Sequence, residues 1–305
     1  MTEAKLLFET YRIRLVEERI AAIYPSDRVQ SPVHLSNGQE AIAVGLCANL
    51  SDNDLVFGTY RSHALYLAKG GDLRELMAEL FGKVTGCTMG KGGSMHLAAK
   101  DVGVYGSSAI VASTIPHAVG AAYAASLRNS QQLVVCFFGE GATGTGVYHE
   151  CLNFASIHQL PLLFVCEYNG LAIYSRTKDI QAFDIVAHAN SYGIITSVEE
   201  NGFDVTAVFS AARREIENIR SVGGPRLLLV HTCRYKEHVG PGDTTNEEYR
   251  PHSMLEEWKS KDPLIVNIDR LGKFKTEIEV EIDDAIKFAE DSAFPEVSEL
   301  LKDIV

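Results

Sequence analysis

Hydrophobic and polar residues along this chain form blocks that predict strands and helices in turn. The clearest block begins with an apolar, β-branched run over residues 133–138, continues through a glycine turn and a helical segment, and ends in a second apolar run over 162–166. That order predicts a strand, a turn, a helix and a second, parallel strand. Further short apolar runs at 54–60, 194–198 and 226–231 predict three more strands.

Helices are predicted wherever apolar residues recur at helical spacing among polar ones. These segments are 4–24, 38–50, 73–81, 115–127 and 204–222. Ser36 is expected to cap the second of these helices. Residues 86–96 contain too many glycines for a helix or a strand and predict an irregular loop, and loops are also expected at 105–108 and 174–182.

The alternation of strands with helices predicts the α/β class, with one doubly wound, mainly parallel sheet flanked by helices. A length of 305 residues allows one large domain or two small ones, and we expect a single domain over 1–305. It is expected to carry helical extensions at both ends. These are an N-terminal helical arm over 1–30 and a charged C-terminal helical segment over 254–305, with breaks at Pro263 and Pro295.

Composition narrows the class of protein. A hydrophobic content of 46% with 22% charged residues is typical of a globular chain. The net charge of -12 argues against a nucleic-acid partner, since such binding draws on basic surface. The six cysteines are scattered without a C-x-x-C pair, and no run of about 18 apolar residues occurs. We therefore expect a soluble, cytoplasmic protein with no membrane partner.

Two polar side chains follow the strands of the central block. Glu140 comes after the first strand and Asn169 after the second, and such carboxyl ends are where open α/β sheets bind ligands. The glycines of this turn match a dinucleotide fingerprint, but Glu140 inside the turn would repel phosphates. A Mg²⁺ ion between carboxylate and phosphate would reverse that repulsion. The pattern favours a metal–diphosphate site, and a plain glycine turn with a solvated glutamate remains the alternative.

Other candidate residues each have a functional and an ordinary interpretation. Arg61, beside Tyr60 at a predicted strand end, can bind phosphate oxygens as a fork or be a surface arginine. His238, in a polar, turn-rich stretch, can be functional or simply exposed, and the same holds for His63 and His96. The chain shows no hydrolase triad order, C-x-x-C zinc pattern or H-E-x-x-H motif. Any catalysis would therefore depend on a cofactor.

Taken together, these segments resemble the alpha subunit of thiamine-diphosphate-dependent 2-oxo acid dehydrogenases, of the pyruvate, branched-chain and acetoin types. The resemblance covers most of the chain, from residue 34 to about residue 301. Its landmarks, in chain order, are His34–Ala41, Tyr60–His63, Gly90–His96, Ile115–Ala122, Gly139–Ala142 and the span from Gly139 to Asn169.

The resemblance implies thiamine diphosphate and Mg²⁺ as cofactors and assigns residues to them. Glu140, Asn169 and the main-chain carbonyl of Leu171 match the Mg²⁺ ligands. His238 matches a histidine near the diphosphate and the reacting carbon, and it is expected to be catalytic together with His63. The cofactor-binding positions are matched by Tyr60, Arg61, Ala109, Val111, Gly139, Glu140, Gly141, Ala142, Asn169, Leu171 and His238.

The resemblance also implies an enzyme that decarboxylates a 2-oxo acid and transfers the acyl group to a lipoyl acceptor. A beta subunit supplies a glutamate to the active site in that family, so we expect this chain to act only with a beta subunit, in an α2β2 heterotetramer. A lipoyl-bearing acyltransferase is a further expected partner. Residues 236–240 depart from the family's histidine-rich, serine-bearing loop. That departure leaves open a transketolase-like carboligase or acyltransferase with an aldehyde, ketone or sugar acceptor, or a scaffold subunit without turnover.

Overall fold

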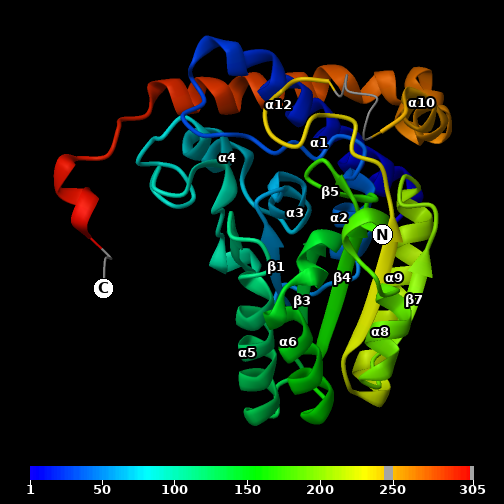
Figure 1. Ribbon diagram of the computed structural model, residues 1–305. Coiled ribbons are helices and arrows are strands. Elements are labelled where there is room, and N and C mark those ends of the chain that lie inside the picture. The colour runs from blue at the N-terminus through cyan, green and yellow to red at the C-terminus, as the bar shows by residue number, and fades with distance from the viewer. Residues whose placement is uncertain (244–249, 303–305) are drawn as a thin grey trace.

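The computed structural model describes residues 1–243 and 250–302. A six-stranded sheet lies at its centre, and all of its strand pairs are parallel (Figure 1). The predicted α/β fold with a doubly wound, mainly parallel sheet is therefore confirmed. In spatial order the strands are β2 (Val104–Ser108), β1 (Leu55–Thr59), β3 (Val134–Gly139), β4 (Leu162–Tyr168), β8 (Arg226–His231) and β7 (Ile195–Glu199).

Helices bury both faces of this sheet. Successive side chains of β3 point into opposite cores, with Val135 and Phe137 in one and Val134, Cys136 and Phe138 in the other. Because both faces are buried, the strands are continuous apolar runs in the sequence. The second core is covered by α5 (Thr114–Leu127), α6 (Gly146–Ile157) and α8 (Ile185–Ser191). The first core contains side chains of α1 (Glu3–Ile23), α2 (Glu40–Cys47), α3 (His63–Ala68), α4 (Leu73–Leu80), α9 (Val205–Val222) and α12 (Ile268–Asp291).

Both ends of the chain are helical, as predicted. Helices α1 and α12 pack against each other across the top of the view in Figure 1. Phe8 and Phe274 meet edge to face between them, and Arg12 donates a hydrogen bond of 2.8 Å to Glu281. The C-terminal segment consists of α10 (His252–Lys261), α11 (Pro263–Val266), α12 and a short 3-10 helix, η5 (Val297–Leu301). Residues 303–305 of the predicted segment 254–305 lie outside the described residues, and the division into one domain with two extensions stays a prediction.

Two segments predicted as loops contain regular structure. Residues 105–108 belong to β2, which pairs with β1 at the edge of the sheet. Only Val104 and Ser107 of this edge strand are buried, so its sequence lacks the apolar run that marks the central strands. Residues 174–182 contain β6 (Ser175–Arg176), which forms a hairpin with β5 (Leu171–Ala172), and the short α7 (Thr177–Ile180).

The predicted cap at Ser36 is also wrong. Helix α2 begins at Glu40, and its N-cap residue Gln39 makes no side-chain capping bond. The main-chain N–H of Ser36 instead donates to the carboxylate of Glu17 at 2.8 Å. A contact with α1, remote in sequence, therefore decides the conformation of this residue, and no local pattern could indicate it.

The glycine-rich loop at 86–96 is irregular, as predicted, except for a short 3-10 helix, η2 (Gly93–Met95), and it encloses a carboxylate of its own chain. Glu79 of α4 is fully buried, and its two oxygens accept four main-chain hydrogen bonds. The donors are the N–H groups of Thr88 (2.8 Å), Gly90 (2.9 Å), Gly92 (2.8 Å) and Gly93 (2.9 Å). Successive N–H groups form a concave anion site. Here the anion is Glu79, so the loop does not present that site to a phosphate.

Replacing Glu79 by Gln keeps the side-chain shape but puts an NH2 group against main-chain donors. We expect Glu79→Gln to lower the free energy of unfolding by about 3 kcal/mol, because each unsatisfied buried donor costs about 1–3 kcal/mol. Urea unfolding measures the change. Glu75→Gln, at an exposed position of the same helix, is the control and should stay within about 0.5 kcal/mol of the unmutated chain. Equal stability of the two variants would contradict this account of the loop.

Candidate functional site

A cavity lies at the carboxyl ends of β1, β3 and β4, where the sequence predicted a ligand. It is lined by residues at or just after the ends of these three strands, together with residues that follow β2 and β8. Most of the predicted cofactor-binding residues line this one cavity. They are Tyr60, Arg61, Val111, Gly139, Glu140, Gly141, Ala142, Asn169, Leu171 and His238.

Glu140 brings a buried carboxylate to the cavity. It is the first residue of the 3-10 turn η4 (Glu140–Gly144) after β3, and it is 1% exposed. Within the described residues, the hydrogen bonds that its oxygens accept are long, 3.4 Å from the Asn169 N–H and 3.4 Å from the Thr177 hydroxyl. Burial raises the pKa of Glu140 to about 7, and nearby main-chain N–H groups act in the opposite direction. A bound cation would favour the charged carboxylate, so this side chain fits a metal ligand.

Asn169 and Leu171 add oxygen atoms on the β4 side of the cavity. The Leu171 N–H donates to Asn169 Oδ1 at 3.0 Å, which orients the amide and leaves a second lone pair on that oxygen. Within residues 1–243 and 250–302, no group of three or more His, Cys, Asp or Glu side chains could hold a metal ion. A metal ion at this site would therefore need amide, main-chain and ligand oxygens as well as Glu140. That donor set suits Mg²⁺, which commonly combines few protein ligands with phosphate oxygens.

Arg61 and Arg234 bring positive charge to the same cavity. Arg61 donates to the carbonyl oxygens of Leu35 at 2.6 Å and His238 at 3.0 Å. No carboxylate of the described residues lies within ion-pair distance of Arg61. Burial, and then the charge of Arg234, lower the pKa of Arg61 to about 10. Arg234 is 1% exposed and donates to the carbonyl of Lys236 at 2.9 Å. An anionic ligand would offset this concentration of charge.

His238 belongs to a ring cluster beside these arginines. Its ring centroid lies 5.1 Å from that of His34 and 5.4 Å from that of Tyr60. Burial, followed by Arg61 and Arg234, lowers the pKa of His238 to about 4. Burial and Arg61 likewise lower the pKa of His34 to about 3. Both imidazoles are therefore neutral at pH 7, and the nearby guanidinium charges make them weak bases in the free cavity.

His63 and Ala109 are absent from the described lining of the cavity. His63 is fully buried at the start of α3, with Nδ1 2.9 Å from the Glu17 carboxylate and Nε2 2.7 Å from the Ser94 hydroxyl. These contacts fit a structural link between α1 and the glycine loop, and a catalytic role for His63 stays a prediction. Ala109 lies between the lining residues Ser108 and Ile110, so its main-chain contact with a cofactor also stays a prediction.

Residues 9–298 match the family described as "Dehydrogenase E1 component". The chain belongs to the dehydrogenase E1 component family. The resemblance inferred from the sequence is thus confirmed. The predicted class of enzyme, the 2-oxo acid dehydrogenases, and thiamine diphosphate as the cofactor of this family are confirmed with it.

Three relatives of this E1 chain are alpha subunits. It is 37% identical to the alpha subunit of acetoin:2,6-dichlorophenolindophenol oxidoreductase from Bacillus subtilis (strain 168), over 100% of this chain and 94% of that protein. It is 34% identical to the pyruvate dehydrogenase E1 component subunit alpha of Porphyra purpurea, over 94% and 88%. For the subunit of the same name from Rhizobium meliloti (strain 1021) the identity is 32%, over 99% and 90%.

Three charged or amide side chains of the cavity in this E1 chain were not predicted from the sequence. Glu167, near the end of β4, and Arg234, just after β8, follow the strand-end rule that identified Asn169. Burial raises the pKa of Glu167 to about 7, while Arg61 acts to lower it. Gln39 enters from the start of α2, and its buried Oε1 has no hydrogen-bond partner among the described residues. No local signal marks Gln39, because only the packing of α2 against the sheet brings it here.

Binding of pyrophosphate with Mg²⁺ should raise the pKa of His238. The phosphate charges would offset those of Arg61 and Arg234, which now oppose protonation of the ring. At pH 5 the free site holds His238 mostly neutral and Glu140, with a pKa of about 7, mostly protonated. Binding of Mg²⁺ should therefore release a proton from Glu140 while His238 takes one up. Calorimetry in buffers of different ionisation enthalpy measures the net proton exchange. His238→Gln should take up fewer protons, or release more, than the unmutated chain, and equal proton exchange in the two would contradict the assignment.

Proposed function

We propose that this cavity binds thiamine diphosphate through its diphosphate group and a Mg²⁺ ion. In this proposal the chain is the alpha subunit of an enzyme that decarboxylates a 2-oxo acid and transfers the acyl group to a lipoyl acceptor. One observation carries the proposal: the buried carboxylate of Glu140, the half-buried guanidinium of Arg61 and the buried guanidinium of Arg234 line a single cavity at strand ends. A metal diphosphate complements this arrangement, because its metal ion matches the carboxylate and its phosphate oxygens match the guanidinium groups.

The protein groups divide between metal and diphosphate. Glu140, Asn169 and the carbonyl of Leu171 would hold Mg²⁺, whose other ligands would be diphosphate oxygens and water. Arg61 and Arg234 would bind the diphosphate, since planar guanidinium groups match phosphate oxygens. Thiamine diphosphate, when bound, supplies carbanion stabilisation for decarboxylation. His238, neutral at pH 7 and inside the cavity, is the group of this chain proposed to accept or deliver a proton.

A beta subunit is the expected partner, because the named relatives are alpha subunits. Three apolar residues line the cavity and are also exposed: Ile110 at 71%, Val111 at 49% and Ile173 at 51%. Exposed apolar groups around a cavity favour coverage by another protein surface. We propose that the beta subunit covers them, supplies the glutamate that completes the site, and joins this chain in an α2β2 heterotetramer that serves a lipoyl-bearing acyltransferase.

The cytoplasm is the proposed compartment. No helix within the described residues has the length and apolar character needed to span a membrane. The six cysteines are all free, and all except Cys87 are buried. Free thiols are typical of a reducing compartment, which supports this part of the proposal.

Activity of the chain with its beta subunit tests the proposed function. Reduction of an artificial electron acceptor should depend on thiamine diphosphate, Mg²⁺ and a substrate, and the chain alone should be inactive. Pyruvate, branched-chain 2-oxo acids and acetoin are the substrates to compare, because relatives are named for pyruvate and acetoin. Turnover that ignores thiamine diphosphate would refute the proposal. Product formation from sugar phosphates, without lipoamide acylation, would support the carboligase alternative.

Glu140→Gln should weaken cofactor binding to the assembled enzyme. The amide keeps the shape of the side chain but lacks the charge that Mg²⁺ requires. We expect the affinity for thiamine diphosphate with Mg²⁺ to fall about 100-fold, whereas Glu140→Asp, which keeps the charge, should retain part of it. Equilibrium binding by calorimetry measures both. Glu200→Gln, at an exposed position near His231, is the control; a Glu140→Gln affinity equal to this control would rule out the metal role.

A further inference from the structure

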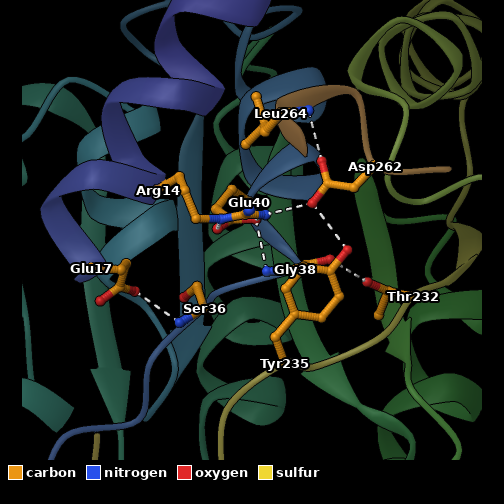
Figure 2. A network of polar contacts seen from close by, with 9 residues as sticks. All are labelled: Arg14, Glu17, Ser36, Gly38, Glu40, Thr232, Tyr235, Asp262 and Leu264. Carbon is orange, nitrogen blue, oxygen red and sulfur yellow. Dashed lines mark hydrogen bonds and ion pairs between the residues drawn. The ribbon is translucent and has the colours of Figure 1, made fainter. Parts of the chain in front are cut away.

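Four buried polar side chains from distant parts of the sequence meet next to the segment that carries Arg234 and His238. Figure 2 shows Arg14 of α1 beside Glu40 of α2, with Asp262 next to it and the Tyr235 hydroxyl pointing to the same oxygen of Asp262 that Arg14 reaches. We call Arg14, Glu40, Tyr235 and Asp262 the buried ionic network. All four residues are at most 8% exposed.

Every carboxylate oxygen of this network accepts a hydrogen bond. Arg14 donates to both oxygens of Glu40 and, at 2.9 Å, to Asp262 Oδ2. One cation, Arg14, thus bonds to two carboxylates, and the remaining hydrogen bonds to these carboxylates come from neutral donors. These donors are the Gly38 N–H to Glu40 at 2.9 Å, the Tyr235 hydroxyl to Asp262 Oδ2 at 3.0 Å, and the Leu264 N–H to Asp262 Oδ1 at 2.8 Å.

Stability alone does not account for such a network. Desolvation of buried charges offsets much of their attraction, and apolar replacements of similar size are often as stable. Unlike apolar contacts, the hydrogen bonds of buried ionic groups are directional, so each bond requires its partner at a defined position. The directional bonds of this network therefore hold in place the segments that carry its four side chains.

The network lies where two remote segments are in main-chain contact. The Tyr235 N–H donates to the Asn37 carbonyl at 2.9 Å, and the Thr232 hydroxyl donates to the Gly38 carbonyl at 3.2 Å. Gly38 has a φ of +91°, and a Cβ atom on it would lie 2.2 Å from the Cys233 carbonyl oxygen. Only glycine permits this approach. Tyr235 thus joins the backbone before α2 through its N–H and Asp262 through its hydroxyl.

The same segment delivers two side chains to the cavity. Tyr235 faces the buried ionic network, whereas its neighbour Arg234 and the nearby His238 line the cavity. Arg61 joins both sides of this contact, since it donates to the carbonyl oxygens of His238 and Leu35. A shift of the backbone at Tyr235 would therefore move Arg234 and His238, and it would loosen the carbonyls that hold Arg61.

We propose that Tyr235, anchored by Asp262 and Arg14, is a positioning residue for diphosphate binding. It holds the backbone from which Arg234 and His238 reach the cavity, and it connects the start of α11 to the site. The inference rests on the proposed function, because the diphosphate is the group that these residues are proposed to bind.

Tyr235→Phe, made in the chain assembled with its beta subunit, removes only the hydroxyl that donates to Asp262. We expect the dissociation constant of thiamine diphosphate with Mg²⁺, measured well below the unfolding temperature, to rise about tenfold, the effect of one hydrogen bond to a charged group. Hydrogen exchange of the backbone at 232–240 should also become faster. Tyr148→Phe is the matched control, because Tyr148 is a fully buried tyrosine whose hydroxyl has no partner among the described residues; it should change neither quantity.

The outcomes separate positioning from a merely structural role. A lower unfolding temperature with unchanged cofactor affinity overturns the inference, and so does faster exchange without weaker binding. If the unmutated complex binds no thiamine diphosphate, the proposed function fails. The inference about Tyr235 is then judged by hydrogen exchange at 232–240 and by the affinity for inorganic pyrophosphate. If either quantity is the same in Tyr235→Phe as in the unmutated complex, the inference is overturned. Should Tyr235→Phe fail to assemble, Asp262→Asn, whose side-chain oxygen can still accept from the Leu264 N–H, removes the acceptor of both Tyr235 and Arg14 and should weaken binding at least as much; unchanged affinity would overturn the inference.

Discussion

Strands β3 and β4 pair in parallel from Val134 opposite Leu162 to Gly139 opposite Glu167. This register places the residues that follow the two strands, Glu140 and Asn169, at one edge of the sheet. A slip of one residue would turn every side chain of a strand to the opposite core. Since both cores are tightly filled with apolar side chains, the register is strongly constrained, and the geometry of the proposed metal site follows from it.

The buried charges of this protein fall into two kinds. Glu79 accepts four short main-chain hydrogen bonds and is fully satisfied within the chain. Glu140, in contrast, accepts long bonds, and burial raises its pKa, while burial lowers the pKa of Arg61 in the same cavity. Charged groups held in this way cost stability until a ligand of complementary charge binds. Both carboxylates are buried, so burial does not distinguish Glu140 in the candidate site from Glu79 in the loop. They differ in how well their charge is balanced by hydrogen bonds within the chain.

The buried ionic network shows how the ends of the chain take part in this site. Arg14 comes from the first helix and Asp262 from the start of α11, yet both act on the segment that carries Arg234 and His238. The helices outside the sheet therefore do more than cover the first core. They hold in place the segment after β8, which contains no regular structure of its own over residues 232–235.

The sequence by itself determined the central strands, most helices, and the place of Glu140 and Asn169 at the strand ends that line the cavity. These features depend on local periodicity and on a general rule for the carboxyl ends of parallel strands. Only the tertiary structure decided that Arg234 and Gln39 reach the cavity, that His63 is enclosed by Glu17 and Ser94, that Ser36 bonds to α1, and that residues 104–108 form an edge strand. Each of these outcomes depends on a contact between residues far apart in the chain, and such contacts leave no pattern in the neighbouring sequence.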